Sequence, residues 1–357
     1  MIELDGGGHP VWVGSGILGR AAALLPRGRF FLVSDGNVAR AGWADRLASS
    51  LGSRLLGSHL LPNGEEHKNL RTLETLLDAL IEARVERDDH VLALGGGVVG
   101  DVAGFAAAVL KRGCGFVQVP TTLLAQADAA IGGKTGVNAR QAKNLIGAFH
   151  RPSAVIVDAA TLATLPAREL RCGYAEVVKY GLIGDPVFFA WCEENGAALL
   201  AGDERARLHA VLTGIRAKVE RVAGDEHDRT GRRALLNFGH TFGHAIEAET
   251  GMPHGEAVAV GMAWAFKLSA ERDLCPPGDV QRVERHFRSV GLPTRLEGID
   301  PGRLAARMLH DKKRRGGAMR MILTRGIGEA FVDDDVEASE VEAFLTREQR
   351  SAAVAVG

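Results

Sequence analysis

Residues 90–100, HVLALGGGVVG, decide the fold class, because they place an apolar run, a glycine turn and the start of a helical pattern in that order. The short apolar run is typical of a strand that is buried on both faces. The glycines from Gly95 to Gly100 satisfy the spacing GxGxxG, which lets the backbone approach a pyrophosphate at a helix N-terminus. We therefore expect a nucleotide-binding strand–turn–helix unit. The alternative is a tight turn without a ligand.

The residues around this unit continue the same alternation. Parallel strands covered by helices produce this order of short apolar runs and longer amphipathic segments. The expected strands are Phe30–Val33, Val91–Leu94, Phe116–Val119 and Val155–Val157, and helical patterns occupy 37–51, 65–85 and 98–110. Asp35 ends the first of these strands, where it could bind a ribose hydroxyl or cap the following helix.

The pattern changes beyond Pro166, where most segments have helical length and periodicity. The expected helices cover 167–180, 204–222, 240–249, 256–271 and 280–290, and two strand-like runs follow at 319–323 and 329–332. We predict an α/β nucleotide-binding domain with a parallel sheet in residues 1–165. A mostly α-helical domain follows in residues 166–357.

Composition excludes several classes of protein. The 357 residues contain 43 Lys and Arg against 44 Asp and Glu, so no general attraction to nucleic acid or to anionic membranes is expected. No apolar stretch approaches the roughly 20 residues of a membrane span, and residues 1–10 lack the pattern of a signal peptide. The four cysteines are far apart and form no CxxC. These features indicate a cytoplasmic protein that acts on a small molecule.

Three histidines and one glutamate could form a metal site. His240 and His244 are four residues apart and share a helical face, and His254 follows ten residues after His244. Glu176 lies in an apolar helical stretch, where a charge needs a compensating cation. Imidazoles and a carboxylate are ligands of catalytic zinc, although spacing does not decide which of them bind. The alternatives are hydrogen-bonded histidines and a local Glu176–Lys179 pair.

Several cations stand beside glycine, asparagine or aspartate in loop-like segments, a setting that suits phosphate or carboxylate groups. For any one of them the simpler interpretation is a solvated surface charge, and the set is informative only if the fold brings its members together. They are Arg112, Lys134, Lys143, Lys179, Lys218, Arg233, Lys312 and Lys313. Asp128 precedes Lys134 by six residues and could hold a substrate hydroxyl or orient that lysine. A dinucleotide, a metal ion and a polyanionic hydroxylated substrate together favour redox chemistry at a carbinol.

The chain closely resembles the 3-dehydroquinate synthase family of the sugar phosphate cyclases. The resemblance extends from about residue 30 to residue 332. The similar stretches are PNGEEHK (62–68), GGGVVGD (95–101), VPTTLLAQ (119–126), GGKT (132–135), KNLIGAF (143–149), EVVKYG (176–181), LNFGHTFGHAIE (236–247), HGEAV (254–258) and DKK (311–313). The resemblance implies an NAD-binding α/β domain, a helical domain, and a zinc or cobalt ion in the cleft between them.

Site residues carry over from the family motifs position by position. The metal ligands would be Glu176, His240 and His254. His244 would support these ligands without binding the metal ion, or would transfer protons. The NAD contacts would be Asp35, Asn37, Glu65, Lys68, Gly96, Gly97, Asp101, Thr121, Thr122, Lys143 and Thr164. The substrate contacts would be Arg112, Asp128, Lys134, Asn144, Lys179, Lys218, Arg233, Asn237 and Lys312. The family is commonly dimeric, so we expect a homodimer.

The family substrate is 3-deoxy-D-arabino-heptulosonate 7-phosphate, whose carboxylate and phosphate explain the cations. The resemblance implies that NAD oxidises the alcohol at C5, phosphate leaves, NADH returns the hydride, and ring opening and aldol closure give 3-dehydroquinate. Two loops depart from the family pattern, at Ala129–Ala130 and at 139–142. The alternatives are another sugar phosphate cyclase, such as an aminodehydroquinate synthase, and a metal-dependent polyol dehydrogenase.

Overall fold

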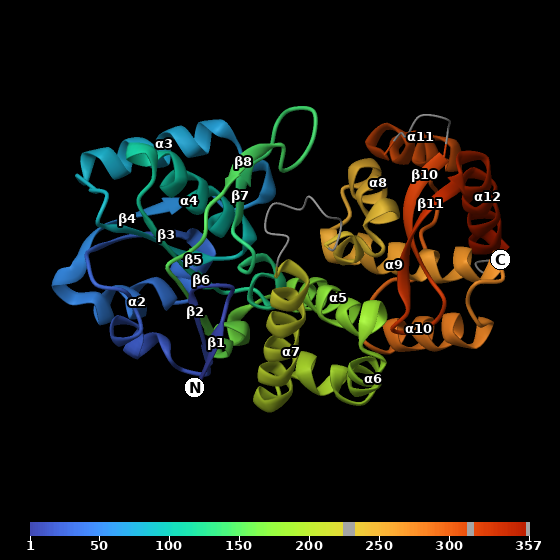
Figure 1. Cartoon of the computed structure of the whole chain (residues 1–357), viewed down its shortest axis with the longest axis horizontal. Helices are drawn as coiled ribbons and strands as arrows, with labels where there is room; N and C mark the ends of the chain where they lie inside the picture. The colour runs from blue at the N-terminus through green and yellow to red at the C-terminus, as the bar shows by residue number, and fades with distance from the viewer. Residues whose placement is uncertain (224–232, 313–317, 355–357) are drawn as a thin grey trace. The chain divides into compact units, whose positions relative to one another are not determined.

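The computed structural model describes residues 1–223, 233–312 and 318–354, and side chains at 1–223, 233–308 and 319–350. The chain divides into two compact units (Figure 1). The first unit comprises Met1–Leu170 and Gly202–His227, and the second comprises Arg171–Ala201 and Asp228–Gly357. The sequence suggests two consecutive segments that meet at residues 165 and 166. In the structure, helix α7 (Glu204–Val222) instead belongs to the first unit, because it packs on the π-helical turn η5 (Ala125–Ala129) of that unit.

A seven-stranded sheet forms the centre of the first unit, in the order β1-β2-β9-β6-β5-β3-β4. All neighbouring strands pair in parallel except β1 and β2, which form an antiparallel hairpin at one edge. The strands are β1 (Ile2–Asp5), β2 (Pro10–Gly14), β3 (Phe30–Asp35), β4 (Leu55–Leu61), β5 (His90–Gly95), β6 (Gly115–Pro120) and β9 (Ala154–Asp158). The expected parallel sheet is therefore confirmed.

Helices cover both faces of this sheet (Figure 1). Phe31 and Val33 of β3 pack under α3 (Leu70–Glu82) and α4 (Gly97–Val109). Phe30 and Leu32, the alternate residues of the same strand, pack on the opposite face with Leu47 of α2 (Trp43–Leu51). Burial on both faces explains why the central strands are mostly apolar instead of alternating between apolar and polar residues.

The carboxyl ends of β3, β5 and β6 lie together at the carboxyl edge of the sheet, because β5 pairs in parallel with both β3 and β6. Gly95 and Pro120 are paired in register, and the Thr121 amide donates to the Gly95 carbonyl at 3.0 Å. Helix α1 (Gly36–Arg40) begins after β3, and α4 begins after the glycine turn. A hairpin of β7 (Lys134–Val137) and β8 (Ile146–Phe149) follows η5 in the chain. Asp35, the glycine turn and Thr121, which follow these strands, are thereby placed at the carboxyl edge.

The second unit is mostly helical. Its helices are α5 (Ala167–Gly184, which starts in the first unit), α6 (Pro186–Ala201), α8 (His240–Thr250), α9 (His254–Glu271), α10 (Pro277–Ser289), α11 (Pro301–Lys312) and α12 (Ala338–Val354), with the antiparallel pair β10 (Ala318–Thr324) and β11 (Ala330–Glu337). Its core includes Trp264 of α9, Phe242 of α8 and Phe344 of α12. The expected mostly helical second half is confirmed.

Two glycines allow α8 and α9 to pack closely. A Cβ atom at Gly261 of α9 would lie 2.0 Å from the carbonyl oxygen of Gly239. Gly239 itself has φ +79°, a left-handed conformation that strongly favours glycine, and it is the residue that precedes α8. This close approach holds the first residue of α8, His240, near α9.

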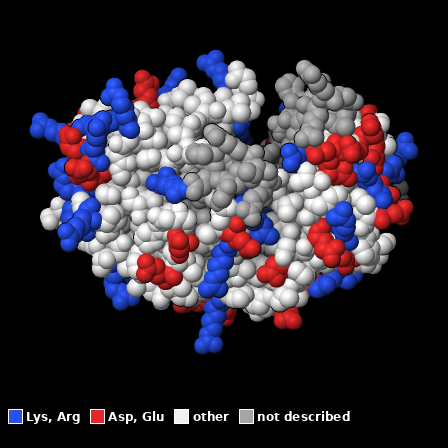
Figure 2. Space-filling view, viewed as in Figure 1, with Lys and Arg blue, Asp and Glu red and all other residues white. Residues whose placement is uncertain are grey.

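Charged side chains of both signs are intermixed on the face of the molecule seen in Figure 2, in keeping with a formal net charge of −1. Among the described residues, no helix combines the length and the apolar character that crossing a membrane requires.

Candidate functional site

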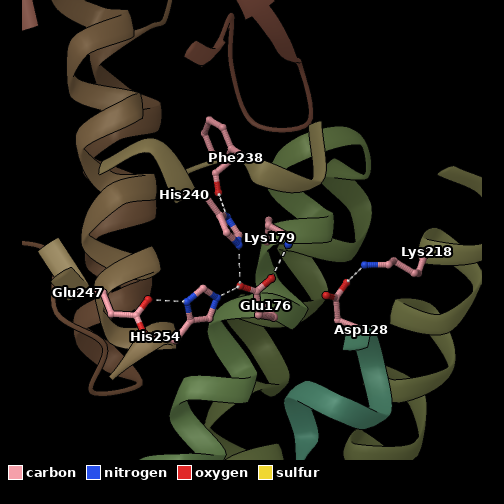
Figure 3. A network of polar contacts seen from close by, with 8 residues as sticks. All are labelled: Asp128, Glu176, Lys179, Lys218, Phe238, His240, Glu247 and His254. Atoms are coloured by element: carbon pink, nitrogen blue, oxygen red, sulfur yellow. Dashed lines mark hydrogen bonds and ion pairs between the residues drawn. The ribbon is translucent and has the colours of Figure 1, made fainter. Parts of the chain in front are cut away.

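A buried carboxylate on α5 is the centre of the candidate site. Glu176 is 2% exposed, and one of its oxygens, Oε2, accepts a hydrogen bond from Nζ of Lys179 one turn later. The other oxygen, Oε1, lies 3.4 Å from Nε2 of His240 and 3.5 Å from Nε2 of His254. Within the described part of the chain, this buried oxygen has no hydrogen bond. Figure 3 shows both imidazoles directed at it from the α8–α9 hairpin.

Each imidazole is oriented through its second nitrogen. Nδ1 of His240 lies 3.2 Å from the carbonyl oxygen of Phe238, and Nδ1 of His254 lies 3.1 Å from Oε2 of Glu247 on α8 (Figure 3). When Nδ1 donates to these oxygens, Nε2 presents its lone pair toward Glu176. This is the arrangement by which proteins fix the tautomer of metal-binding histidines.

The charges at this cluster follow from burial and from neighbouring groups. Burial raises the pKa of Glu176, but Lys179 and the two imidazoles outweigh burial and hold this pKa well below its usual range. Burial lowers the pKa of His240 well below its ordinary value, so this ring is neutral at pH 7. Burial opposes protonation of His254, but the neighbouring carboxylates of Glu176 and Glu247 outweigh burial and raise its pKa to about 9 in the metal-free protein.

The donor set fits a divalent metal ion. One oxygen of Glu176 and one nitrogen each of His240 and His254 all lie within 4.8 Å of one another. A carboxylate and two imidazoles suit zinc or cobalt, and three protein ligands leave a coordination position for substrate. A buried carboxylate oxygen without a hydrogen bond is costly unless a cation or another donor compensates it. The unsatisfied Oε1 is therefore the observation that favours a metal ion here.

His244 lies beside this cluster rather than within it. Its ring centroid is 5.3 Å from that of His240 and 5.9 Å from that of His254, and its side chain is exposed. The group whose ligand atoms converge does not include it. Its role in proton handling stays a prediction.

The glycine turn of the first unit has open space where an anion could approach. A Cβ atom at Gly97 would meet no atom within 4 Å, whereas one at Gly96 would lie 3.0 Å from Cγ2 of Thr122. Gly96 precedes α4 and offers no side chain to cap it. The first N–H groups of a helix have no acceptor within the helix, so this end can bind an anion.

Two other candidate nucleotide residues, Asp35 and Thr164, accept hydrogen bonds from neighbouring groups of the protein. Asp35 caps α1, since Oδ1 accepts from the amides of Asn37 and Val38 at 2.8 and 3.0 Å. Thr164 Oγ1 accepts from the indole nitrogen of Trp43 at 2.8 Å. The capping alternative for Asp35 is thus present in the structure, and its ribose contact stays a prediction.

A second cluster joins candidate nucleotide and substrate residues. Nζ of Lys68, a buried side chain, donates to Asp101 at 2.5 Å and to Oδ1 of Asn144. Oε1 of Glu65 accepts from Nδ2 of Asn138 at 2.8 Å. Burial raises the pKa of Asp101, although Lys68 opposes that shift. The adjacent Lys143 is exposed.

The remaining candidate residues are described by their contacts and by the exposure of their side chains. Asp128 on η5 accepts from Nζ of Lys218 on α7 at 2.9 Å (Figure 3). Exposed residues are Lys134, Asn37, Asn237 and Arg112, the last with a left-handed φ of +67°, whereas Arg233 and Thr121 are buried and Thr122 is half-buried. Lys312 ends α11, but its side chain and all of Lys313 lie outside the described residues.

Two residues that carry contacts at these clusters received no role from the sequence. Glu247 stands seven residues after His240 and three after His244, so helical spacing places all three on one face. Asn138 precedes the departing loop by one residue and offered no such signal. Its contacts depend on chain segments that are distant in sequence.

The fold is that of the sugar phosphate cyclases. The structure of 2-epi-5-epi-valiolone synthase from Streptomyces hygroscopicus, with NAD+ and Zn2+ bound, is 33% identical and has a TM-score of 0.86, with 97% of each chain covered. A 2-deoxy-scyllo-inosose synthase complexed with carbaglucose-6-phosphate, NAD+ and Co2+ is 27% identical with a TM-score of 0.86, and 97% of this chain and 99% of that chain are covered.

The family is narrower than this fold class. Family models described as 3-dehydroquinate synthase N-terminal and C-terminal match residues 58–172 and 173–314. The 3-dehydroquinate synthase of Rhodospirillum rubrum is 52% identical over 360 aligned residues, which cover 96% of this chain and 93% of that protein. The chain belongs to the 3-dehydroquinate synthase family.

Proposed function

We propose that this protein converts 3-deoxy-D-arabino-heptulosonate 7-phosphate to 3-dehydroquinate and inorganic phosphate, as a step of the shikimate pathway that leads to chorismate and the aromatic amino acids. Family membership over nearly the whole chain supports the reaction. The observation that carries the chemistry is the buried Oε1 of Glu176, which faces two imidazole nitrogens and has no hydrogen bond among the described residues.

We propose NAD and either Zn2+ or Co2+ as cofactors, because structural relatives hold NAD+ with one or other of these metals. When bound, NAD would take a hydride from the substrate carbinol and return it, while the metal ion would act as a Lewis acid on that oxygen. Glu176, His240 and His254 would hold the metal ion. Glu247 and the Phe238 carbonyl would keep the two imidazoles in the metal-binding tautomer.

The first unit would bind NAD at the carboxyl edge of its sheet. The open approach at Gly97 and the N-terminus of α4 suit the pyrophosphate. Further contacts are proposed for Asp35, Asn37, Glu65, Lys68, Gly96, Asp101, Thr121, Thr122, Lys143 and Thr164. Lys68 would act from a defined position, because its ammonium is already held by Asp101 and Asn144.

The anionic and hydroxyl groups of the substrate need complementary side chains. We propose Arg112, Lys134, Lys179, Arg233 and Lys312 for the carboxylate and phosphate, and Asp128, Asn144, Lys218 and Asn237 for hydroxyl groups. The Asp128–Lys218 pair keeps both side chains extended toward each other. His244, which is exposed beside the metal ligands, is proposed to transfer protons.

The test is turnover of the heptulosonate phosphate by metal-stripped protein, with NAD and Zn2+ or Co2+ supplied separately and together. We expect equal amounts of phosphate and a product with the mass of 3-dehydroquinate when both cofactors are present, and no accumulation of NADH. Phosphate release without a carbocyclic product would refute the proposal. Net NADH formation would favour a polyol dehydrogenase, and preference for an amino analogue of the substrate would favour an aminodehydroquinate synthase.

A matched pair of variants tests the site itself. Glu176→Gln should abolish turnover and metal binding, since a neutral amide replaces the anionic ligand. Glu193→Gln, which removes an ion pair between Glu193 of α6 and Arg282 of α10, should leave turnover and metal binding unchanged.

We also propose a cytoplasmic homodimer, which sedimentation of the purified protein would test. The four cysteines are buried thiols, as expected of a protein from a reducing compartment.

A further inference from the structure

The loop between β7 and β8 carries candidate site residues, although most of it is exposed. Val137 pairs with Ile146, so residues 138–145 form the connection. Lys143, Asn144 and Leu145 are all exposed, and Leu145 is 67% exposed. Exposure of this degree leaves little packing to hold the loop in one conformation. Polar contacts must therefore define the position of Asn144.

Asn138 supplies several of these contacts. Its backbone amide donates to the carbonyl oxygen of Lys68 at 2.8 Å. Its side-chain nitrogen, Nδ2, donates to Oε1 of Glu65 at 2.8 Å. Its Oδ1 accepts from the amide of Asn144 at 2.9 Å. The side chain of Asn138 thus bridges Glu65 and the far end of the loop, while its backbone is joined to Lys68.

The contact to Asn144 has a conformational consequence. Asn144 has a left-handed φ of +57°, which costs energy for a residue with a Cβ atom. The hydrogen bond from its amide to Asn138 stabilises this conformation. The side-chain oxygen of Asn144 then accepts from Nζ of Lys68. The backbone conformation and the side-chain direction of Asn144 are therefore both defined by contacts with the same short region.

We propose that Asn138 is a positioning residue for the reaction, which aligns Asn144 with Lys68 and Glu65 through its side-chain amide. This inference rests on the proposed function, in which Glu65 and Lys68 bind NAD and Asn144 binds substrate. An amide is required at this position, because its nitrogen donates to a carboxylate while its oxygen accepts from a backbone amide. Asn138 itself touches no reacting atom in this scheme.

The first experiment replaces Asn138 by Asp, which has almost the same shape. The new carboxylate retains an acceptor for the Asn144 amide but faces Glu65 with like charge. We expect KM for the heptulosonate phosphate to rise roughly tenfold or more at pH 8, with a smaller change in kcat. Two adjacent carboxylates share a proton as the pH falls, so the variant should recover relative to the parent between pH 8 and pH 6.

The second experiment reverses the donor and the acceptor. In the double variant Asn138→Asp with Glu65→Gln, the amide at 65 can donate to the carboxylate at 138, and the pH-dependent defect should disappear. Asn138→Asp should therefore raise KM much less in the Glu65→Gln background than in the parent. Equal effects of Asn138→Asp in both backgrounds, or a defect that does not change with pH, would overturn the proposal.

A control and a readout without substrate separate this inference from the proposed function. Asn195→Asp removes a hydrogen bond to the Trp191 carbonyl on α6 and should leave KM unchanged. Amide hydrogen exchange of residues 138–145 should accelerate at least severalfold in Asn138→Ala, with the parent rate unchanged elsewhere in the first unit. Inactivity of the parent protein would refute the proposed function, whereas unaltered exchange in this loop would refute the role of Asn138.

Discussion

Oε2 of Glu247 lies 3.1 Å from Nδ1 of His254, across the α8–α9 hairpin, and this contact leaves Nε2 of the same ring 3.5 Å from Oε1 of Glu176. Two carboxylates thus flank one imidazole, each on a different nitrogen. The Glu247 carboxylate sets the direction of the ring and raises its basicity, which strengthens a metal–nitrogen bond. The hairpin that supplies two of the three ligand atoms also supplies the group that orients one of them.

Removal of this second carboxylate should weaken metal binding. Glu247→Ala should reduce the affinity for Zn2+ by roughly ten- to a hundredfold, and Glu247→Gln should reduce it less, since its amide oxygen still accepts from Nδ1. Competition with a chromophoric chelator measures the affinity. Glu249→Ala, on the same helix but paired with Arg303 and Arg307, is the control and should have no effect. Equal affinities for Glu247→Ala and the parent would contradict the orienting role.

The Glu176–Lys179 pair should also contribute to stability in the metal-free protein. Lys179 is 1% exposed, so Glu176→Gln leaves a buried ammonium without its carboxylate. We expect the free energy of unfolding to fall by roughly 3 kcal/mol in urea with chelator present. Adding Lys179→Met should recover much of this loss, because it removes the buried charge. A double variant no more stable than Glu176→Gln would show that the loss has another cause.

Substitution of Gly97 in the glycine turn should have different effects on the free energy of unfolding and on NAD binding. Gly97→Ala places a Cβ atom in open space at the start of α4, so the free energy of unfolding should stay the same or rise by up to about 1 kcal/mol. The same methyl group should hinder a pyrophosphate and weaken NAD binding at least tenfold, as measured by calorimetry. Gly278→Ala near the start of α10 also meets no atom within 4 Å and should change NAD affinity not at all.

Acid should destabilise the second unit through His286. Burial lowers the pKa of this histidine to about 4, and its Nε2 contacts the Tyr174 hydroxyl at 2.9 Å. Between roughly pH 6.5 and pH 4 the unfolded chain binds a proton that the folded His286 does not, so the free energy of unfolding falls as the pH falls through this range. The full contribution, roughly 3 kcal/mol, is present above pH 6.5. Urea unfolding of the parent and of His286→Phe at several pH values should show a shallower acid dependence in the variant.

Sequence patterns predicted the centre of the first unit well and its edges poorly. The strands β3, β5, β6 and β9 are largely buried and mostly apolar, and all four were expected. The edge strand β4 is partly exposed along most of its length, so Leu55–Leu61 did not stand out. The single helix expected over 37–51 is two helices, because Gly42 has φ +81° and precedes α2.

Helix boundaries and a few whole helices also required the structure. The pattern over 65–85 becomes α3 only from Leu70, since the Asn69 side chain caps the Thr72 amide. Helix α6 was not expected, because its own apolar residues lie on several sides of the helix and give no clear amphipathic period. Helices α11 and α12 were not expected either, although they pack on the core of the second unit.

Local chemistry along the chain was sufficient to predict a parallel sheet, a glycine turn beside a helix N-terminus, and histidines near a buried glutamate, since burial, backbone freedom and helical spacing are short-range properties. Spacing alone did not decide which of His240, His244 and His254 accompany Glu176, and only the family resemblance implied His240 and His254. Tertiary packing brings the ligand atoms of His240 and His254 together at Glu176, because the close approach of α8 and α9 at Gly239 and Gly261 aligns residues from two helices. It likewise decided that Asn138 meets Glu65, since that contact joins chain segments 73 residues apart.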